Sequence, residues 1–243
     1  PLAWRIVLGA AFALFGALYL ANAMAPEISP DGSAYHLRFV ADYHRAHGFV
    51  RITTNMYANL SQGLELLFLF AYVFGRHSAA AMVHMLYLFA LPWMLILWGR
   101  RNGHAVAGAA AAMFTFLSPV VGVDGISAYN DVAIAAVLFA VFYLLDIWRG
   151  ERQAGLLAAI GLLAGFAYAI KYTAFLAVPY SLAVIVWNSW RAKQSWWRPA
   201  LIVSLAALVM IAPWMVKNVV WSGNPFSPFF NQLFPNPYIH IDF

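Results

Sequence analysis

Long apolar stretches separated by short polar connections make up most of this chain. Because about 20 apolar residues cross the hydrocarbon layer as a helix, each long stretch predicts a membrane span. Seven stretches qualify: Leu2–Ala23, Ala79–Gly99, Ala105–Val121, Ala128–Trp148, Ala154–Ile170, Thr173–Trp190 and Pro199–Val216. The stretch Leu64–Phe74 is also apolar but is too short to cross. The pattern predicts an all-α membrane protein with a bundle of about seven transmembrane helices.

The connection between the first two predicted spans, residues 24–78, is long and rich in polar groups. Within it, Ala34–His47 combines arginines, histidines and aromatic residues, which is typical of an amphipathic helix in the membrane interface. We expect Ala34–His47 and Leu64–Phe74 to be helices that lie along the outer surface without crossing. Residues 1–220 then form one transmembrane module, and residues 221–243 begin a further outer loop. A first residue other than methionine and a Pro-rich end favour an incomplete chain.

Basic residues test this count of spans. If the first span starts on the cytoplasmic side, Arg100, Arg101 and the segment Arg191–Arg198 fall in cytoplasmic connections, as the positive-inside bias requires. Counting Leu64–Phe74 as a span would move them outside. The charges therefore favour seven spans and place residues 24–78 on the outer face.

Composition also indicates a membrane protein and excludes several kinds of functional site. The chain is 64% hydrophobic and 9% charged, whereas about a quarter of the residues in a soluble domain are charged. Such a chain needs the bilayer as its solvent. The absence of cysteine excludes disulfides and thiolate metal sites. The sequence contains no Gly-rich phosphate loop, no Ser-His-Asp pattern and no nucleic-acid module, so neither a nucleotide-sugar donor nor a nucleic-acid partner is expected.

Acids are scarce, with 9 Asp and Glu among 243 residues. Asp31 follows the first span shortly, and an acid at the mouth of a helix bundle is a candidate for chemistry. Glu65, Asp124 and Asp131 face the same side in the predicted topology. A carboxylate at this surface can take a proton from an acceptor hydroxyl or amide.

Two basic residues and one histidine complete the candidate site. Lys171 and Lys217 stand at outer ends of predicted spans, where lysines can neutralise a phosphate leaving group. His36 shares a predicted helix face with His44, a spacing that fits either a metal pair or histidines that lie among the headgroups. With Glu65 and Asp124, His36 is a candidate acidic or metal-binding residue. The spacing identifies no particular metal.

Each candidate also has a structural interpretation. Asp31 lies between a proline and a glycine, which fits a turn that caps the following helix. Asp131 in the first turn of a span complements the helix dipole. Lysines at a span boundary, such as Lys171 and Lys217, commonly extend toward the headgroups. Spacing alone leaves both interpretations open.

Five segments, taken in order, carry a family resemblance: Pro30–Leu37, Asn59–Leu66, Ala128–Asp131, Gly165–Thr173 and Pro213–Phe226. Together they resemble the membrane-embedded GT-C glycosyltransferases, in the bacterial branch related to protein O-mannosyltransferases and aminoarabinose transferases. The resemblance implies a first span, a large outer loop with surface helices, and six further spans. It also implies a bacterial inner (plasma) membrane location with the active face periplasmic or extracellular.

The same resemblance implies roles for individual residues. Asp31 matches the catalytic base, Asp131 a second acid near the reaction centre, and Lys171 a basic residue near the donor phosphate. The implied donor is a polyprenyl-phosphate sugar, often assisted by a divalent cation such as Mg or Mn. The chain departs from the mannosyltransferase branch at Gly32, which stands where that branch has the second acid of an Asp-Glu pair.

Two classes of function follow. The first is an inverting glycosyltransferase that moves a sugar from a polyprenyl-phosphate donor to an acceptor at the outer membrane face. The alternative is a non-catalytic GT-C-like subunit that scaffolds a larger assembly with other membrane subunits. A transporter is less favoured, because the charges gather at one face rather than at the midplane where transporter sites lie.

Overall fold

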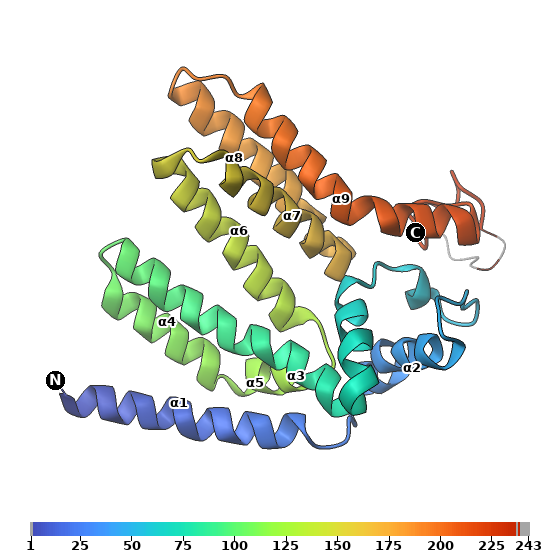
Figure 1. Cartoon of the computed structure of the whole chain (residues 1–243), viewed down its shortest axis with the longest axis horizontal. Coiled ribbons are helices and arrows are strands. Elements are labelled where there is room, and N and C mark those ends of the chain that lie inside the picture. The colour runs from blue at the N-terminus through green and yellow to red at the C-terminus, as the bar shows by residue number, and fades with distance from the viewer. Residues whose placement is uncertain (1, 237, 239–243) are drawn as a thin grey trace. The chain divides into compact units, whose positions relative to one another are not determined.

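Helices make up the fold of this protein, and the described residues contain no strand. The computed structural model describes residues 2–236 and 238 (Figure 1). The α-helices are α1 (Leu2–Ala23), α2 (Leu37–Ala46), α3 (Gly63–Arg101), α4 (Ala105–Leu117), α5 (Pro119–Ile126), α6 (Asp131–Glu151), α7 (Ala154–Ile170), α8 (Ala177–Arg191) and α9 (Trp197–Ser222). A π-helical turn (Gly32–His36) precedes α2, and 3-10 turns occur at Met56–Asn59 and Tyr172–Leu176. The predicted all-α class is confirmed.

Five described helices are long and apolar enough to cross a membrane: α1, α3, α6, the segment Tyr172–Arg191 that includes α8, and α9. The pair α4 and α5 is a sixth candidate, bent by 63°. Helix α7 is apolar but has only 17 residues. All seven predicted stretches are therefore largely helical, and five or six of them meet the length and composition of a span. This is a multi-pass membrane protein.

Helix α3 is two helices that meet at a kink. Gly75 (φ −144°, ψ 18°) and Arg76 (φ 56°, ψ −141°) leave the helical region of backbone conformation. The segment Leu64–Phe74 is thus a separate helix, as predicted, and α2 confirms a helix within Ala34–His47. That these two helices lie along the membrane surface remains a prediction.

The third predicted span, Ala105–Val121, is wrong as a single straight helix. Proline disfavours helical backbone at the residue before it, and Ser118, which precedes Pro119, is extended (φ −65°, ψ 123°). Pro119 then starts α5, because the first turn of a helix does not need its missing N–H. The bend turns the chain into a short helix ahead of the loop that leads into α6.

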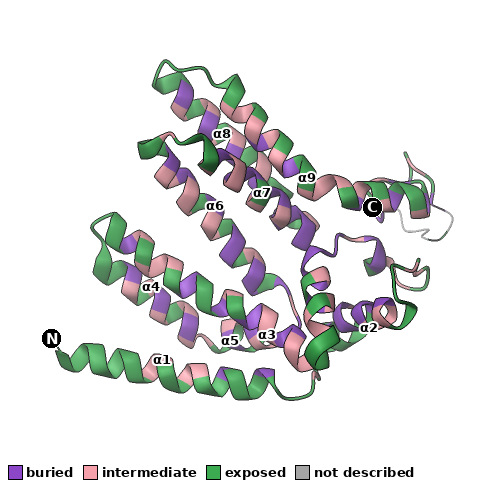
Figure 2. Cartoon of the chain, in the orientation of Figure 1, coloured by how far each residue is buried: buried purple, intermediate pink, exposed green. Residues whose placement is uncertain are grey.

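The chain folds as two compact units. The first comprises Pro1–Arg45 and Glu65–Ala136. Its core joins α1, α3 and α4, with Tyr19, Leu88 and Phe116 all buried. Tyr19 also donates its hydroxyl proton to the carbonyl of Phe116 at 2.6 Å. Helix α1 is exposed along almost its whole length, as Figure 2 shows, and its apolar residues suit contact with lipid.

The second unit comprises Ala46–Leu64 and Val137–Phe243. Its helices α7, α8 and α9 lie side by side (Figure 1). Helices α7 and α9 approach closely because Gly161 and Gly165 of α7 lie against the backbone of Val203 and Ala207; an added Cβ would be 2.5 and 2.4 Å from those carbonyl oxygens. Small residues at helix contacts are the usual device for close packing in a membrane.

Candidate active site

Asp31 immediately precedes the π-helical turn Gly32–His36 and is exposed. Its carboxylate accepts a hydrogen bond from the hydroxyl of Tyr35 at 3.2 Å. Although Asp31 stands at the cap position, its side chain makes no capping hydrogen bond within the described structure. The turn is instead held by Ser33, whose N–H and O–H both donate to the carbonyl of Ser29. The capping interpretation therefore does not account for this acid.

His36 and Glu65 form a buried polar pair in the first unit. Their Nδ1 and Oε1 atoms are 2.5 Å apart, and the residues are 2% and 5% exposed. The second oxygen of Glu65, Oε2, is buried with no hydrogen-bond partner in the part of the chain that the structure describes. The imidazole also contacts the rings of Tyr35 and Tyr129, with centroids 4.2 and 6.2 Å away. The pair anchors the end of the Asp31 turn to the start of α3.

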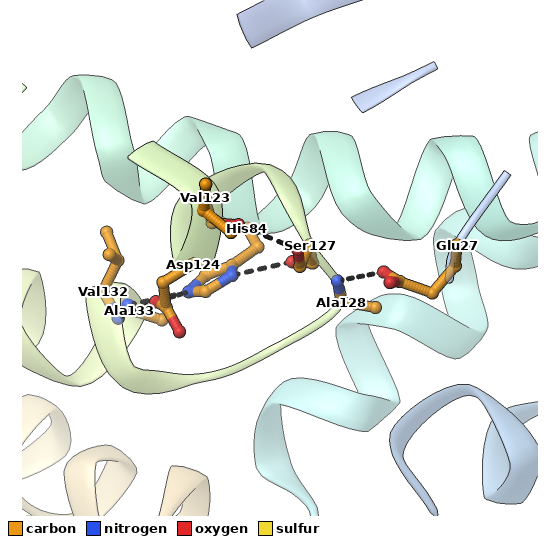
Figure 3. Close-up of polar contacts among 8 residues, drawn as sticks. All are labelled: Glu27, His84, Val123, Asp124, Ser127, Ala128, Val132 and Ala133. Atoms are coloured by element: carbon orange, nitrogen blue, oxygen red, sulfur yellow. Dashed lines mark hydrogen bonds and ion pairs between the residues drawn. The ribbon is translucent and has the colours of Figure 1, made fainter. Parts of the chain in front are cut away.

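Glu27 connects the segment that contains it to the loop between α5 and α6. Its Oε1 accepts the N–H of Ser29 at 2.8 Å, within the segment that leads to Asp31. Its Oε2 accepts the N–H of Ala128 at 2.7 Å, in the loop between α5 and α6 (Figure 3). One carboxylate thus binds both segments.

His84 is a residue of α3 and is fully buried. Its imidazole ring contacts the start of α6 and the loop before it (Figure 3). Its Nδ1 is 2.9 Å from the carbonyl oxygen of Ser127, and its Nε2 is 3.1 Å from the backbone N–H of Ala133. A carbonyl can only accept and an N–H can only donate, so the proton resides on Nδ1 and the ring is neutral. This arrangement gives the imidazole one donor and one acceptor role.

Asp124 also serves the start of α6. Its Oδ2 accepts the N–H of Val132 at 2.8 Å and lies 3.7 Å from Nε2 of His84. The first N–H groups of a helix have no partners within the helix. Here the carboxylate of Asp124 and the imidazole of His84 accept hydrogen bonds from two of them. These contacts give Asp124 a capping function.

Asp131 is the first residue of α6 and is exposed. With Asp124 it lines a cavity of about 510 Å³ in the first unit, whose remaining walls are mostly apolar: Leu91, Thr115, Val120, Val121, Val132 and Ala135. The positive end of the helix dipole favours a carboxylate at this position.

The two predicted lysines belong to the second unit. The Nζ of Lys217 donates to the carbonyls of Ala58 and Leu60, both at 2.9 Å, and lies over the rings of Trp214 and Trp221. Lys171 follows the last residue of α7 and has extended backbone (φ −154°, ψ 130°) before the 3-10 turn.

The side chain beside Lys217 binds the same segment. The Nδ2 of Asn218 donates to the carbonyl of Asn59 at 2.7 Å and to the hydroxyl of Tyr172 at 2.9 Å. It also lies 3.2 Å from the carbonyl oxygen of Ser227. Lys217 and Asn218 thereby attach residues 58–60 to α9.

The predicted site residues thus divide between the units. The five in the first unit are Asp31, His36, Glu65, Asp124 and Asp131, and the structure pairs His36 with Glu65. Within residues 2–236 and 238, no three His, Asp or Glu side chains gather in a way that could hold a metal ion. The divalent cation that the resemblance implies stays a prediction, and the mechanism proposed below does not involve one.

Sequence reasoning missed three side chains of this site: Glu27, Tyr35 and His84. For His84 a signal existed, because an ionisable residue inside a predicted span usually has a specific partner or function. Glu27 lies four residues before Asp31 in an acid-poor chain, but its distant partner is not visible in the sequence.

The fold and these acids define a multi-pass all-α membrane protein with polar groups gathered at helix starts. A family model described as dolichyl-phosphate-mannose-protein mannosyltransferase matches residues 66–216, more than half of the chain. The chain belongs to this family, which is part of the GT-C superfamily of membrane glycosyltransferases. Comparisons with curated proteins and with solved structures found no match.

The matched region contains some candidates and excludes others. His84, Asp124, Asp131 and Lys171 lie inside it. The residues of the Asp31 turn precede the matched region, so their roles rest on geometry and on the resemblance of the first loop.

Proposed function

We propose that this membrane glycosyltransferase transfers a sugar from a polyprenyl-phosphate donor to an acceptor at the outer face of the membrane. The observation that carries the proposal is the exposure of Asp31 together with its hydrogen bonding. It is an exposed carboxylate that caps no helix in the described structure and is oriented by the hydroxyl of Tyr35. Such a group is available to react, whereas Glu27 and Asp124 are bound to backbone N–H groups.

In this mechanism Asp31 is the general base. It takes the proton from the acceptor hydroxyl or amide as that atom attacks the anomeric carbon of the donor. The bond between the anomeric carbon and the phosphate oxygen breaks, and polyprenyl phosphate leaves with the electron pair. One displacement at the anomeric carbon inverts its configuration. Proton transfer of this kind typically contributes 10²- to 10⁴-fold in rate.

Lys171 is the proposed ligand of the donor phosphate. A lysine ammonium stabilises the negative charge that grows on a phosphate leaving group. Lys217 is the second candidate, and its two carbonyl contacts give it a structural function as well. Asp131 stands at a helix start beside an apolar cavity, which supports a place for it near the reaction centre.

Transfer from a panel of polyprenyl-phosphate sugars tests the proposal. Membranes that carry the full-length protein should transfer at least one sugar of the panel, and membranes without it should not. Co-purification with other membrane proteins without any transfer would favour the scaffolding subunit instead.

The proposed location is a bacterial inner membrane with the active face periplasmic or extracellular. Cysteines introduced at Asn102 and Gln194 should resist an impermeant thiol reagent, and a cysteine at Ser33 should react. Because the chain has no cysteine, each label reports one position. Labelling of Asn102 from outside would contradict the topology.

A further inference from the structure

One half-buried carboxylate, Glu27, joins the two loops that carry the exposed acids of the first unit. Its Oε1 is bonded to the N–H of Ser29, two residues before Asp31. Its Oε2 is bonded to the N–H of Ala128, three residues before Asp131. Glu27 and Ala128 are 101 positions apart in the chain, so this is a tertiary contact and not a local turn.

The neighbouring backbone is shaped around this carboxylate. A Cβ added to Gly32 would lie 2.8 Å from the carboxyl carbon of Glu27 and 2.4 Å from Oγ of Ser29. Both distances are shorter than real Cβ contacts, so any other residue at position 32 would push Glu27 or Ser29 away. Gly32 therefore leaves the space that the carboxylate occupies. Gly32, which stands where the mannosyltransferase branch has a second acid, thus leaves space for the carboxylate of Glu27.

The loop on the other side is also held. The backbone carbonyl of Ser127, which precedes Ala128, accepts a hydrogen bond from Nδ1–H of His84. The backbone N–H groups of Val132 and Ala133 donate to Asp124 and His84. Figure 3 shows these contacts beside the bond from Glu27. The start of α6 is thus a fixed element, and Glu27 attaches the Asp31 segment to it.

We propose that Glu27 is a positioning residue that holds the Asp31 turn in register with the start of α6, so that Asp31 and Asp131 face one substrate. This inference rests on the proposed transfer reaction. It requires a carboxylate, because one oxygen accepts from the segment that contains Glu27 and the other accepts from the loop before α6. A glutamine has one oxygen, and its NH₂ group would face a backbone N–H.

Hydrogen exchange of the purified full-length protein in lipid nanodiscs tests the attachment without reference to activity. Three variants are compared with the natural sequence: Glu27→Gln, Gly32→Ala and the control Glu151→Gln. Glu151 is an exposed acid at the far end of α6. In Gly32→Ala the added Cβ forces Glu27 or Ser29 to move while the acid at position 27 is retained, so this variant disturbs the same attachment without removing the carboxylate.

Peptides that cover residues 28–33 and 126–130 should both exchange about tenfold faster in Glu27→Gln and in Gly32→Ala, the effect of losing one hydrogen bond on a local opening. The control should match the natural sequence. Unchanged exchange in Glu27→Gln, or faster exchange in only one of the two peptides of that variant, would overturn the proposal.

Kinetics provide the second arm. Misplacing Asp31 relative to the substrate should lower kcat of sugar transfer roughly 10- to 100-fold in both variants, with the KM for the donor unchanged. An unchanged kcat, or a change confined to KM, overturns the positioning function. Failure of the natural sequence to transfer any sugar would refute the proposed reaction, while the exchange measurement still decides whether Glu27 joins the two loops.

Discussion

In the first unit, side chains that accept hydrogen bonds bind the backbone, whereas in the second unit side chains that donate hydrogen bonds do so. In the first unit, Glu27, Asp124 and the Nε2 of His84 accept from backbone N–H groups around the start of α6. In the second unit, Lys217 and Asn218 donate to backbone carbonyls of the segment 58–60.

This difference between the units follows from which backbone groups lack a hydrogen-bond partner within their own helix or loop. A helix start presents N–H groups without partners, whereas residues 58–60 present carbonyls toward α9. In a membrane protein every such group needs a partner, because lipid supplies none. Glu27, Asp124 and Lys217 therefore stabilise the fold through backbone groups. Asp31 differs from them, because its hydrogen bond is to the hydroxyl of Tyr35.

The largest expected effect concerns the acid outside this pattern. Asp31→Asn should lower the rate of sugar transfer by about 10²- to 10⁴-fold, because it removes the base while keeping the size of the side chain. The unfolding temperature should not change. Initial rates in membranes measure the first quantity. The control is Asp42→Asn in α2, since Asp42 pairs with Arg45. Wild-type rates in the Asp31 variant would exclude Asp31 as the base.

The next effect distinguishes the lysine that binds backbone. Lys217→Met should destabilise the folded protein by about 2–3 kcal/mol, since the two carbonyls lose a charged donor and two indole rings lose a cation. Unfolding of the purified protein in detergent measures this change. Stability equal to that of the natural sequence would mean that these carbonyls do not depend on Lys217.

Lys171→Met provides the contrast. The substitution keeps the apolar stem and removes only the charge, so stability should be retained. Affinity for a polyprenyl-phosphate analogue should fall by about 1.5–3 kcal/mol, the range for a hydrogen bond to a charged group. Binding to the purified variant measures it. A Lys171 variant with normal affinity would indicate a lysine that only reaches the headgroups.

The smallest effect concerns the neutral imidazole of His84 in α3, which binds the start of α6. His84→Leu leaves the N–H of Ala133 and the carbonyl of Ser127 without their partner, which should lower stability by about 1–3 kcal/mol. His84→Gln keeps one donor and one acceptor and should recover part of the loss. Thermal unfolding of both variants is the measurement. Equal stability of the leucine and glutamine variants would show that these hydrogen bonds contribute little.

Helix positions could be predicted where an apolar run ends at polar or charged residues. The predicted bounds of α1 and α7 agree with the structure residue for residue, because the length of an apolar run sets the length of a helix in a bilayer. The bend at Ser118 was missed, although Pro119 is visible in the sequence. The family and the all-α class were also correctly predicted.

The partners of the polar residues were decided by tertiary structure. His36 meets Glu65 across 29 positions, Glu27 meets Ala128 across 101, and Lys217 meets Ala58 across 159. Sequence spacing identified which ionisable residues were unusual in an apolar chain, because burying charge is costly wherever it occurs. Which backbone groups those residues satisfy depends on the packing of distant helices, and a hydrogen bond over 2.7–2.9 Å exists only once that packing has brought the atoms together.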